Sequence, residues 1–391
     1  MLSKVSSYFA IVSISLVMAS ANPKASGNND PGFQAIDAYL KSLIDSGGVP
    51  GIAVGITNGS NIVYKKCFGV ANVQTKQKLE PSHIFHIASI SKTFAATAIM
   101  QLHEKGKLDI NKTLVSYLPY FELADNRYKK ITIKQMLNHT TGMPDVEDYE
   151  WEKGTFDEGA AERYTRSLVD KKLLSEPGAE FHYSNMAFDI MADVIAKVSE
   201  IPFERYVKQN ILDPLEMYES SFYFPDIKKS LRTSPHIGNP PTVSAVYPYN
   251  RMHAPSSTLN TNILELAHWA IANINGGKYK ATRILSPTTH AMMMNPTFTI
   301  DAVEKRAIGL SWFMYPYQGT TNYEHGGSDL GYRSMLTLIP SKKLGIIILC
   351  NLNQMPISNV RNTIRDILLN KYKTIGDVGR PRLEPNTVRK S

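Results

Sequence analysis

The sequence predicts a mixed α/β (α+β) fold, with one sheet built from both chain ends and a helical lobe inserted between them. Apolar runs rich in β-branched residues occur at residues 48–72 and again at residues 307–351. Between about 107 and 305, apolar residues recur at helical spacing and proline-rich loops interrupt them. Strands at both ends with helices between them pack most simply as a sheet covered by helices.

The composition is that of a globular protein. The chain has 391 residues, of which 43% are apolar and 20% charged, which excludes a disordered chain and allows a large core. The formal net charge of +8 is scattered, without the interleaved aromatic and basic residues of nucleic-acid binders. Cys67 and Cys350 have no Cys or His neighbours at zinc-ligand spacing, so we predict no metal site. Composition leaves both a disulfide and two free thiols open.

The N-terminus has the pattern of an export signal. Lys4 supplies a positive charge, Tyr8–Met18 is mainly apolar, and Ala19-Ser20-Ala21 fits a cleavage site. The apolar run is too short to span a bilayer. We therefore predict a signal peptide at residues 1–21, no stable membrane anchor, and an exported protein that is periplasmic or secreted. An uncleaved N-terminal anchor is the alternative.

The rest of the chain reads as one domain, residues 22–372, followed by a loose tail at 373–391 that lacks periodicity. Its first clear element is a hairpin around Asn58-Gly59, because this dipeptide favours tight turns between strands. A helix is expected from about Ser89 to Lys105, ended by Gly106.

Later elements follow from the same patterns. A helical stripe contains Met186, Ile190, Val194 and Ile195. Further strands are expected in "AIGLSWFMY", "TNYEHGG", "YRSMLTLIP" and "LGIIILCN", and a last helix in "SNVRNTIRDILLNKY".

Ser89 and Lys92 are separated by one helical turn, which places both side chains on one helix face. A serine hydroxyl becomes a good nucleophile only when a base removes its proton. Lysine can be that base if burial lowers its pKa, and the helix after Lys92 is very apolar. Taken alone, the pair is more simply explained as the polar face of an ordinary helix.

Two further motifs carry candidate site residues. In "EFHYSNMAFDIM", Tyr183 could relay a proton and Asn185 could hold a substrate carbonyl, although a helix cap explains the same serine and asparagine. In "EHGGSD", His325 precedes Gly327 and Ser328 at a strand end, where glycine allows a substrate to approach the backbone. A glycine-rich loop explains this segment as well.

Together these motifs resemble those of the serine β-lactamase and penicillin-binding-protein superfamily, in order and in context. The branch most similar is that of class C β-lactamases, D-Ala-D-Ala carboxypeptidases, D-aminopeptidases and family VIII esterases. The similarity extends over about residues 33–370 and includes "VPGIAVGI", "IASISKTFAATAIMQLHEKGKLDINKTLVSYLP", "ITIKQMLNHTTGMPD", "EPGAEFHYSN" and "GYRSMLTLIPSKKLGIIILCN".

The resemblance implies a β-lactamase-like fold with an antiparallel sheet, and a serine hydrolase that needs no cofactor. Ser89 would form an acyl-enzyme, while Lys92 and Tyr183 would share the proton transfers. Asn185 would hold the substrate amide, and the backbone N–H groups of Ser89 and Ser328 would form the oxyanion hole. The substrate would be a small molecule or a cell-wall peptide: a carboxylic ester, a D-amino-acid peptide or a β-lactam.

Other implications concern single residues. His325 stands where many β-lactamases have lysine, and a histidine is only partly charged near neutral pH. We therefore expect it to titrate between pH 5 and 8 and to favour esters without a carboxylate. His139 and Thr141 are expected to fix a turn. In the family's sheet the first strand would separate the two cysteine strands, which predicts two free thiols.

Three other functions compete with this prediction. An α/β-hydrolase needs Gly-x-Ser-x-Gly, and "GGSDLG" has Leu330 in place of the last glycine. A metalloenzyme built on His83, His86 or His139 lacks a partner pattern. A penicillin-binding or sensor protein that is acylated without turnover remains the alternative function. Oligomeric state is not predicted.

Overall fold

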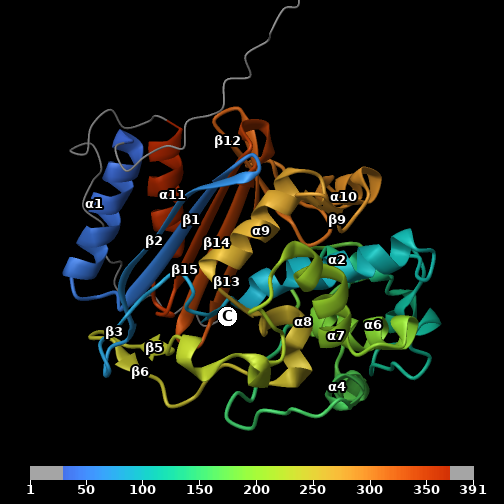
Figure 1. The fold of residues 1–391 in the computed structure, drawn as a ribbon. Helices are drawn as coiled ribbons and strands as arrows, with labels where there is room; N and C mark the ends of the chain where they lie inside the picture. Colours follow the sequence, from blue (N-terminus) through green and yellow to red (C-terminus); the bar gives the residue numbers. More distant parts are fainter. Residues whose placement is uncertain (1–29, 370–391) are drawn as a thin grey trace, which may run out of the picture.

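The computed structural model describes residues 30–369, so the predicted signal peptide and the predicted tail at 373–391 lie outside the described residues. A large sheet forms the centre of the molecule (Figure 1). Helices α1 (Pro31–Asp45) and α11 (Ile357–Leu368) pack together on one face of this sheet, and α9 (Ile263–Ile274) packs on the other. The remaining helices gather beyond α9 in a lobe of their own.

The sheet is antiparallel and is built from both chain ends, as the sequence predicts. Its nine strands in the described residues run in the order β10-β11-β12-β13-β14-β15-β1-β2-β3. Their bounds are β1 Gly51–Asn58, β2 Asn61–Asn72, β3 Gln77–Lys78, β10 Phe298–Asp301, β11 Arg306–Ile308, β12 Phe313–Tyr317, β13 Thr320–Asp329, β14 Tyr332–Ile339 and β15 Leu344–Cys350. β1 and β15 are buried on both faces apart from Asn58, because helices cover the sheet on each side.

The hairpin predicted around Asn58-Gly59 joins β1 to β2. Asn58 pairs with Asn61, and Gly59 has a φ of 58°, which favours glycine. β1 lies between the two cysteine strands, since Cys67 pairs with Ala53 and Cys350 with Ile52. The two cysteines are free, and this strand order confirms the prediction that they are not neighbours.

The chain between β3 and β10 forms the lobe and the helix that joins it to the sheet. Its apolar stripe lies in the core, as expected from the helical spacing. Its helices are α2 Ser91–Glu104, α3 Ile133–Leu137, α4 Ala160–Ser167, α5 Asn185–Asp189, α6 Met191–Ser199, α7 Phe203–Val207, α8 Ala254–Ser257, α9 and α10 Pro287–Met294. Three short two-stranded pairs accompany them: β4 Phe85–His86 with β7 Asn260–Thr261, β5 His236–Ile237 with β6 Thr242–Val243, and β8 Lys278–Tyr279 with β9 Thr282–Arg283.

Helix α2 runs through the core of the lobe, and residues 91–102 of it are all buried. It begins at Ser91, two residues later than predicted, because Ser89 lies in a 3₁₀ turn formed by Ala88–Ile90. Ala88 in this turn has a φ of 48°, a strained conformation for a residue with a side chain. The chain thus turns sharply just before α2 and leaves Ser89 partly accessible while Lys92 enters the core.

Candidate active site

Residues from the three sequence motifs meet in one cavity of about 540 Å³. The cavity lies where the second half of β13 faces the 3₁₀ turn before α2 and the start of α5. Its walls include six of the seven predicted site residues, namely Ser89, Tyr183, Asn185, His325, Gly327 and Ser328. The seventh, Lys92, is fully buried directly beneath Ser89.

Lys92 is held by three contacts at the floor of this cavity. Its Nζ lies 3.0 Å from Ser89 Oγ and 2.8 Å from the backbone oxygen of Ser256 in α8, and it also donates to Asn185 Oδ1. Burial lowers the pKa of Lys92 to about 8, although the carboxylates of Asp189 and Asp145 act in the opposite direction. The amine therefore loses its proton at about pH 8, far more easily than an exposed lysine.

Tyr183 completes the group around the serine. Its side chain lines the cavity together with Ser89, and its ring centroid lies 5.1 Å from Lys92 Nζ. Burial raises the pKa of Tyr183 above its usual value, so the phenol keeps its proton at neutral pH. Of Lys92 and Tyr183, Lys92 therefore loses its proton more easily.

His139 supports Tyr183 from behind. The two rings stack with their centroids 4.3 Å apart, and His139 Nδ1 accepts a hydrogen bond from the Ser184 N–H. His139 has a φ of 58°, and Thr141 Oγ1 accepts from the Met143 N–H, so both residues shape a turn, as expected. Burial and the Lys92 charge hold the pKa of His139 well below its usual value, and the imidazole stays neutral.

Ser184 and Asn185 have different roles: Ser184 caps a helix, whereas Asn185 contacts Lys92. Ser184 caps α5, because its hydroxyl accepts from the Ala187 N–H. Asn185 is the first residue of α5 and turns its side-chain oxygen toward Lys92. Its amide nitrogen lies 2.9 Å from Asp145 Oδ1. Sequence reasoning missed Asp145, although the "LNHTTGMPD" segment ends on this residue.

The expectation that His325 titrates between pH 5 and 8 is wrong. Its side chain is 2% exposed, and burial together with the Lys92 charge lowers its pKa to about 3. Nδ1 lies 2.9 Å from the carbonyl oxygen of Gly326, which can only accept, so Nδ1 carries the proton. Nε2 is then a buried acceptor with no partner among the described residues. His325 offers a neutral hydrogen-bond acceptor and no charge.

The packing of the protein itself requires a glycine at position 327. A Cβ at this position would lie 2.2 Å from the backbone oxygen of Ile87 and 2.2 Å from Ser334 Oγ. The absence of a side chain therefore lets β13 pack directly against the turn that carries Ser89. Ser328, the next residue, is exposed toward the cavity. This packing keeps the backbone of Ser328 beside Ser89.

A polar cluster at the end of β13 was not predicted. Asp329 Oδ2 accepts from Ser257 and lies 2.7 Å from His86 Nε2. Ser257 follows Ser256, whose carbonyl holds Lys92. The cluster therefore ties α8, and with it one of the three contacts of Lys92, to β13 and β4.

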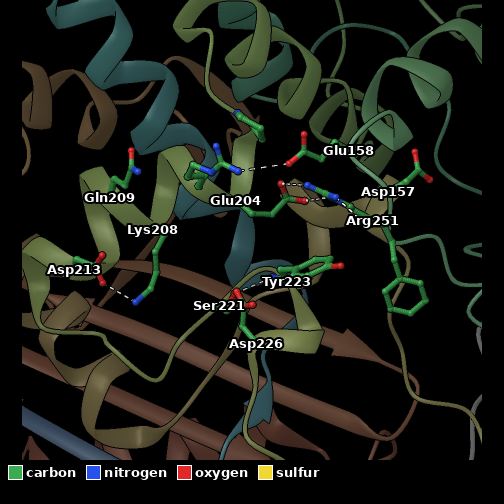
Figure 2. Close-up of a pocket in the computed structure, with 13 residues that line it drawn as sticks. Asp157, Glu158, Glu204, Lys208, Gln209, Asp213, Ser221, Tyr223, Asp226 and Arg251 are labelled. Carbon is green, nitrogen blue, oxygen red and sulfur yellow. Dashed lines mark hydrogen bonds and ion pairs between the residues drawn. The ribbon is translucent and has the colours of Figure 1, made fainter.

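A second cavity of about 580 Å³ lies elsewhere in the lobe and contains none of the predicted site residues. Six of its eight charged side chains form ion pairs with one another (Figure 2). Arg251 binds Glu204 through two nitrogens, and Lys208 Nζ lies 2.6 Å from Asp213 Oδ1. The cavity around Ser89, with its shifted pKa values and its accessible hydroxyl, is the stronger candidate.

The described part of the chain, residues 30–369, lacks two features. No helix there is both long and apolar enough to cross a lipid bilayer. No group of three or more His, Cys, Asp or Glu side chains in the same range could hold a metal ion.

Known proteins resemble this chain in sequence over most of its length. Protein flp of Staphylococcus aureus (strain COL) is 28% identical over 355 residues, which cover 88% of this chain and 68% of flp. Beta-lactamase-like protein 2 of Dictyostelium discoideum is 24% identical over 351 residues, 85% of this chain and 63% of that protein.

Two solved structures have a fold similar to that of this chain. An octameric penicillin-binding protein homologue from Pyrococcus abyssi superposes with a TM-score of 0.76 at 24% identity, covering 88% of this chain and 79% of that one. A class C β-lactamase superposes with a TM-score of 0.73 at 18% identity, covering 88% and 98%. The Beta-lactamase family model matches residues 36–370. This chain belongs to the β-lactamase family, whose superfamily consists of serine hydrolases and includes the penicillin-binding proteins.

Proposed function

We propose that this protein is an exported serine hydrolase that acts through an acyl-enzyme on Ser89. The observation that carries the proposal is the position of Lys92, buried and 3.0 Å from the Ser89 hydroxyl. A buried lysine with a lowered pKa is costly to keep and is typical of a catalytic base.

The contacts of Lys92 suggest how it would work. When the amine is neutral, Asn185 Oδ1 and the Ser256 carbonyl can each accept one of its two N–H groups. Its lone pair is then left for the proton of Ser89 Oγ. The serine oxygen forms a bond with the substrate carbonyl carbon, and the bond to the leaving group breaks. Tyr183 and Lys92 return the proton to that leaving group, and water later hydrolyses the acyl-enzyme.

The substrate would lie along β13. The ladder between β12 and β13 ends at Glu324, so residues 325–329 present a strand edge without a partner on that side among the described residues. An extended substrate could bind this edge through backbone hydrogen bonds. The N–H groups of Ser89 and Ser328 would stabilise the oxyanion, each donor contributing about 3–4 kcal/mol. The candidate substrates are a carboxylic ester, a D-amino-acid peptide and a β-lactam.

Two observations favour an alternative, a penicillin-binding or sensor protein that is acylated without turnover. His325 is neutral, and no separate deacylation base like the glutamate of class A enzymes was identified in the sequence. Such a protein would use the same nucleophile and would differ only in the rate of the second step.

A single experiment separates these functions. The purified protein is treated with a fluorophosphonate probe and, separately, with a p-nitrophenyl ester. We expect one covalent adduct, on Ser89, and steady release of p-nitrophenol well beyond one equivalent. Ser89→Ala should lose both, whereas Ser82→Ala, which replaces an exposed serine, should keep both.

Other outcomes of this experiment would change the proposal. A burst of one equivalent followed by no turnover would favour the sensor. An adduct on Ser91 or Ser328 would overturn the assignment of the nucleophile. Export is tested by N-terminal sequencing of the protein outside the cytoplasm, which should begin after Ala21.

A further inference from the structure

Two short helices hold the buried amine of Lys92 between them. α5 contributes Asn185, whose Oδ1 accepts from Lys92, and α8 contributes the Ser256 carbonyl, 2.8 Å from Lys92 Nζ. α5 has five residues and α8 has four, so neither helix is stable by itself. The distance between the two acceptors therefore depends on contacts that join α5 to α8.

A buried hydrogen bond joins these helices one turn away from the two acceptors. Asp189 ends α5, four residues after Asn185, and His253 directly precedes α8, three residues before Ser256. His253 Nδ1 lies 2.7 Å from Asp189 Oδ2, and the two side chains are 4% and 0% exposed. A carboxylate can only accept, so His253 carries the proton on Nδ1 and donates it. These four residues and Lys92 thus form a closed ring of contacts.

Aromatic rings surround His253 on its other sides. Tyr164 of α4, together with Tyr149 and Trp151 from the segment before α4, lies edge-on to the imidazole, with ring centroids 4.8–5.9 Å apart. Burial raises the pKa of both tyrosines, so their phenols are uncharged at neutral pH. Arg251, on the same 3₁₀ turn as His253, has its ion pair in the second cavity. Among the described residues, the carboxylate of α5 is therefore the one charged group that pairs with this imidazole.

We propose that His253 is a positioning residue: its hydrogen bond to Asp189 fixes α5 against α8 and thereby aims the lone pair of Lys92 at the serine hydroxyl. This inference rests on the proposed function, because it takes Lys92 to be the base. His253 does not line the cavity around Ser89, so it acts through Lys92 and leaves the substrate untouched. The Asp189 charge also opposes the effect of burial and raises the pKa of Lys92, so the pair has an electrostatic effect that can be measured.

Three variants separate the hydrogen bond from the charge. His253→Ala removes the donor, whereas His253→Asn keeps an N–H group close to the position of Nδ1. Asp189→Asn keeps an acceptor for His253 and removes the negative charge. For each variant, kcat and KM with p-nitrophenyl acetate are measured from pH 6 to 9.5, after subtraction of the rate of Ser89→Ala.

The expected changes differ in direction. His253→Ala should lower the kcat reached at high pH about 10-fold or more and change KM less than about twofold, because only the orientation of the base is lost. Water in the vacated space and the unpaired Asp189 charge both favour the charged amine, so the midpoint of the pH profile should rise. Asp189→Asn should lower the midpoint, since a charge that raises the pKa of Lys92 is gone. His253→Asn should keep most of the wild-type kcat.

A buried histidine elsewhere gives the matched control. His290 of α10 is also buried and contacts Asn273 of α9, so His290→Ala removes a similar contact without touching α5 or α8. It should lower the melting temperature and leave the midpoint unchanged. The proposal is overturned if His253→Ala keeps the wild-type kcat and midpoint, or if the midpoint of Asp189→Asn does not fall. It is also overturned if His253→Asn loses about 10-fold in kcat, and this criterion holds even where His253→Ala does not fold.

Failure of the proposed function would look different. In that case the wild type itself would show no turnover of the ester that depends on Ser89. Lys92 is then titrated directly by NMR in protein labelled with ¹³C at the lysine Cε, with Lys92→Ala to assign the signal. A midpoint that rises in His253→Ala and falls in Asp189→Asn supports the positioning of Lys92 by this pair, and any other pattern overturns it.

Discussion

The Asp145 carboxylate accepts hydrogen bonds from both the backbone N–H and the side-chain amide of Asn185, at 2.8 and 2.9 Å. This contact fixes which atom of the Asn185 amide faces Lys92, because the nitrogen is occupied by Asp145 and only the oxygen remains. Asp145 thus acts through Asn185 as a positioning residue.

Replacement of Asp145 should change both rate and pH dependence. Asp145→Ala frees the Asn185 amide to rotate, and we expect kcat/KM to fall about 10-fold or more. The Asp145 charge also raises the pKa of Lys92, so its loss should move the midpoint of the pH profile to lower pH. Glu147→Ala, at an exposed carboxylate nearby, is the control. An unchanged midpoint would limit Asp145 to a structural role.

The ionisation of Lys92 should set the pH dependence of the wild type. Only the neutral amine can accept the serine proton, and burial lowers its pKa to about 8. We therefore expect kcat/KM to rise tenfold per pH unit below about pH 8 and to level off above it. Lys92→Ala should lower turnover at least about 100-fold and lose this inflection. A profile that is flat from pH 6 to 9 would exclude Lys92 as the base.

The two glycines of the "HGG" segment should respond differently to a methyl group. Gly327→Ala places Cβ 2.2 Å from the Ile87 backbone, which must displace the turn that carries Ser89. We expect a loss of about 1–3 kcal/mol in stability and a lower kcat. In Gly326→Ala the nearest atom is the flexible end of Met335 at 3.3 Å, so this variant is the matched control. Equal unfolding free energies in urea would contradict the packing argument.

His325→Lys should introduce a charge that the wild type lacks. Because the pKa of His325 is lowered to about 3, the imidazole is neutral between pH 5 and 8 and should add no inflection there. A lysine should shift preference toward carboxylate-bearing β-lactams by about 1–2 kcal/mol. His325→Gln, which stays neutral, should not. Measurement of kcat/KM for an ester and a cephalosporin in all three proteins decides, and equal factors for both substrates would remove residue 325 from recognition.

The two thiols should stay separate even if the protein is exported, as proposed. Burial raises the pKa of both cysteines to about 12, and β1 separates them. Iodoacetamide should label neither in the native protein at pH 8 and both after unfolding without reductant. A mass lower by two hydrogens than that of the reduced chain would show a disulfide.

Features that depend on local spacing were predictable from the sequence. The Ser89–Lys92 pair, the hairpin at Asn58 and the alternation of strands and helices all follow from residues close in sequence. The charge state of His325 was not, since it depends on burial by parts of the chain far from it. Asp145 was missed for the same reason: an aspartate in a loop has no distinct pattern, and only the folded chain brings it to Asn185.

The order of strands has a consequence for biosynthesis. β1 pairs with β15, and the turn that carries Ser89 rests on β13, so strands from the first part of the chain need partners made last. Contacts between such distant segments form slowly, because the intervening chain must be ordered first. A ribosome-bound chain therefore lacks both a closed sheet and a catalytic turn until translation nears its end. Such late folding would suit the proposed export, in which the polypeptide crosses the membrane unfolded.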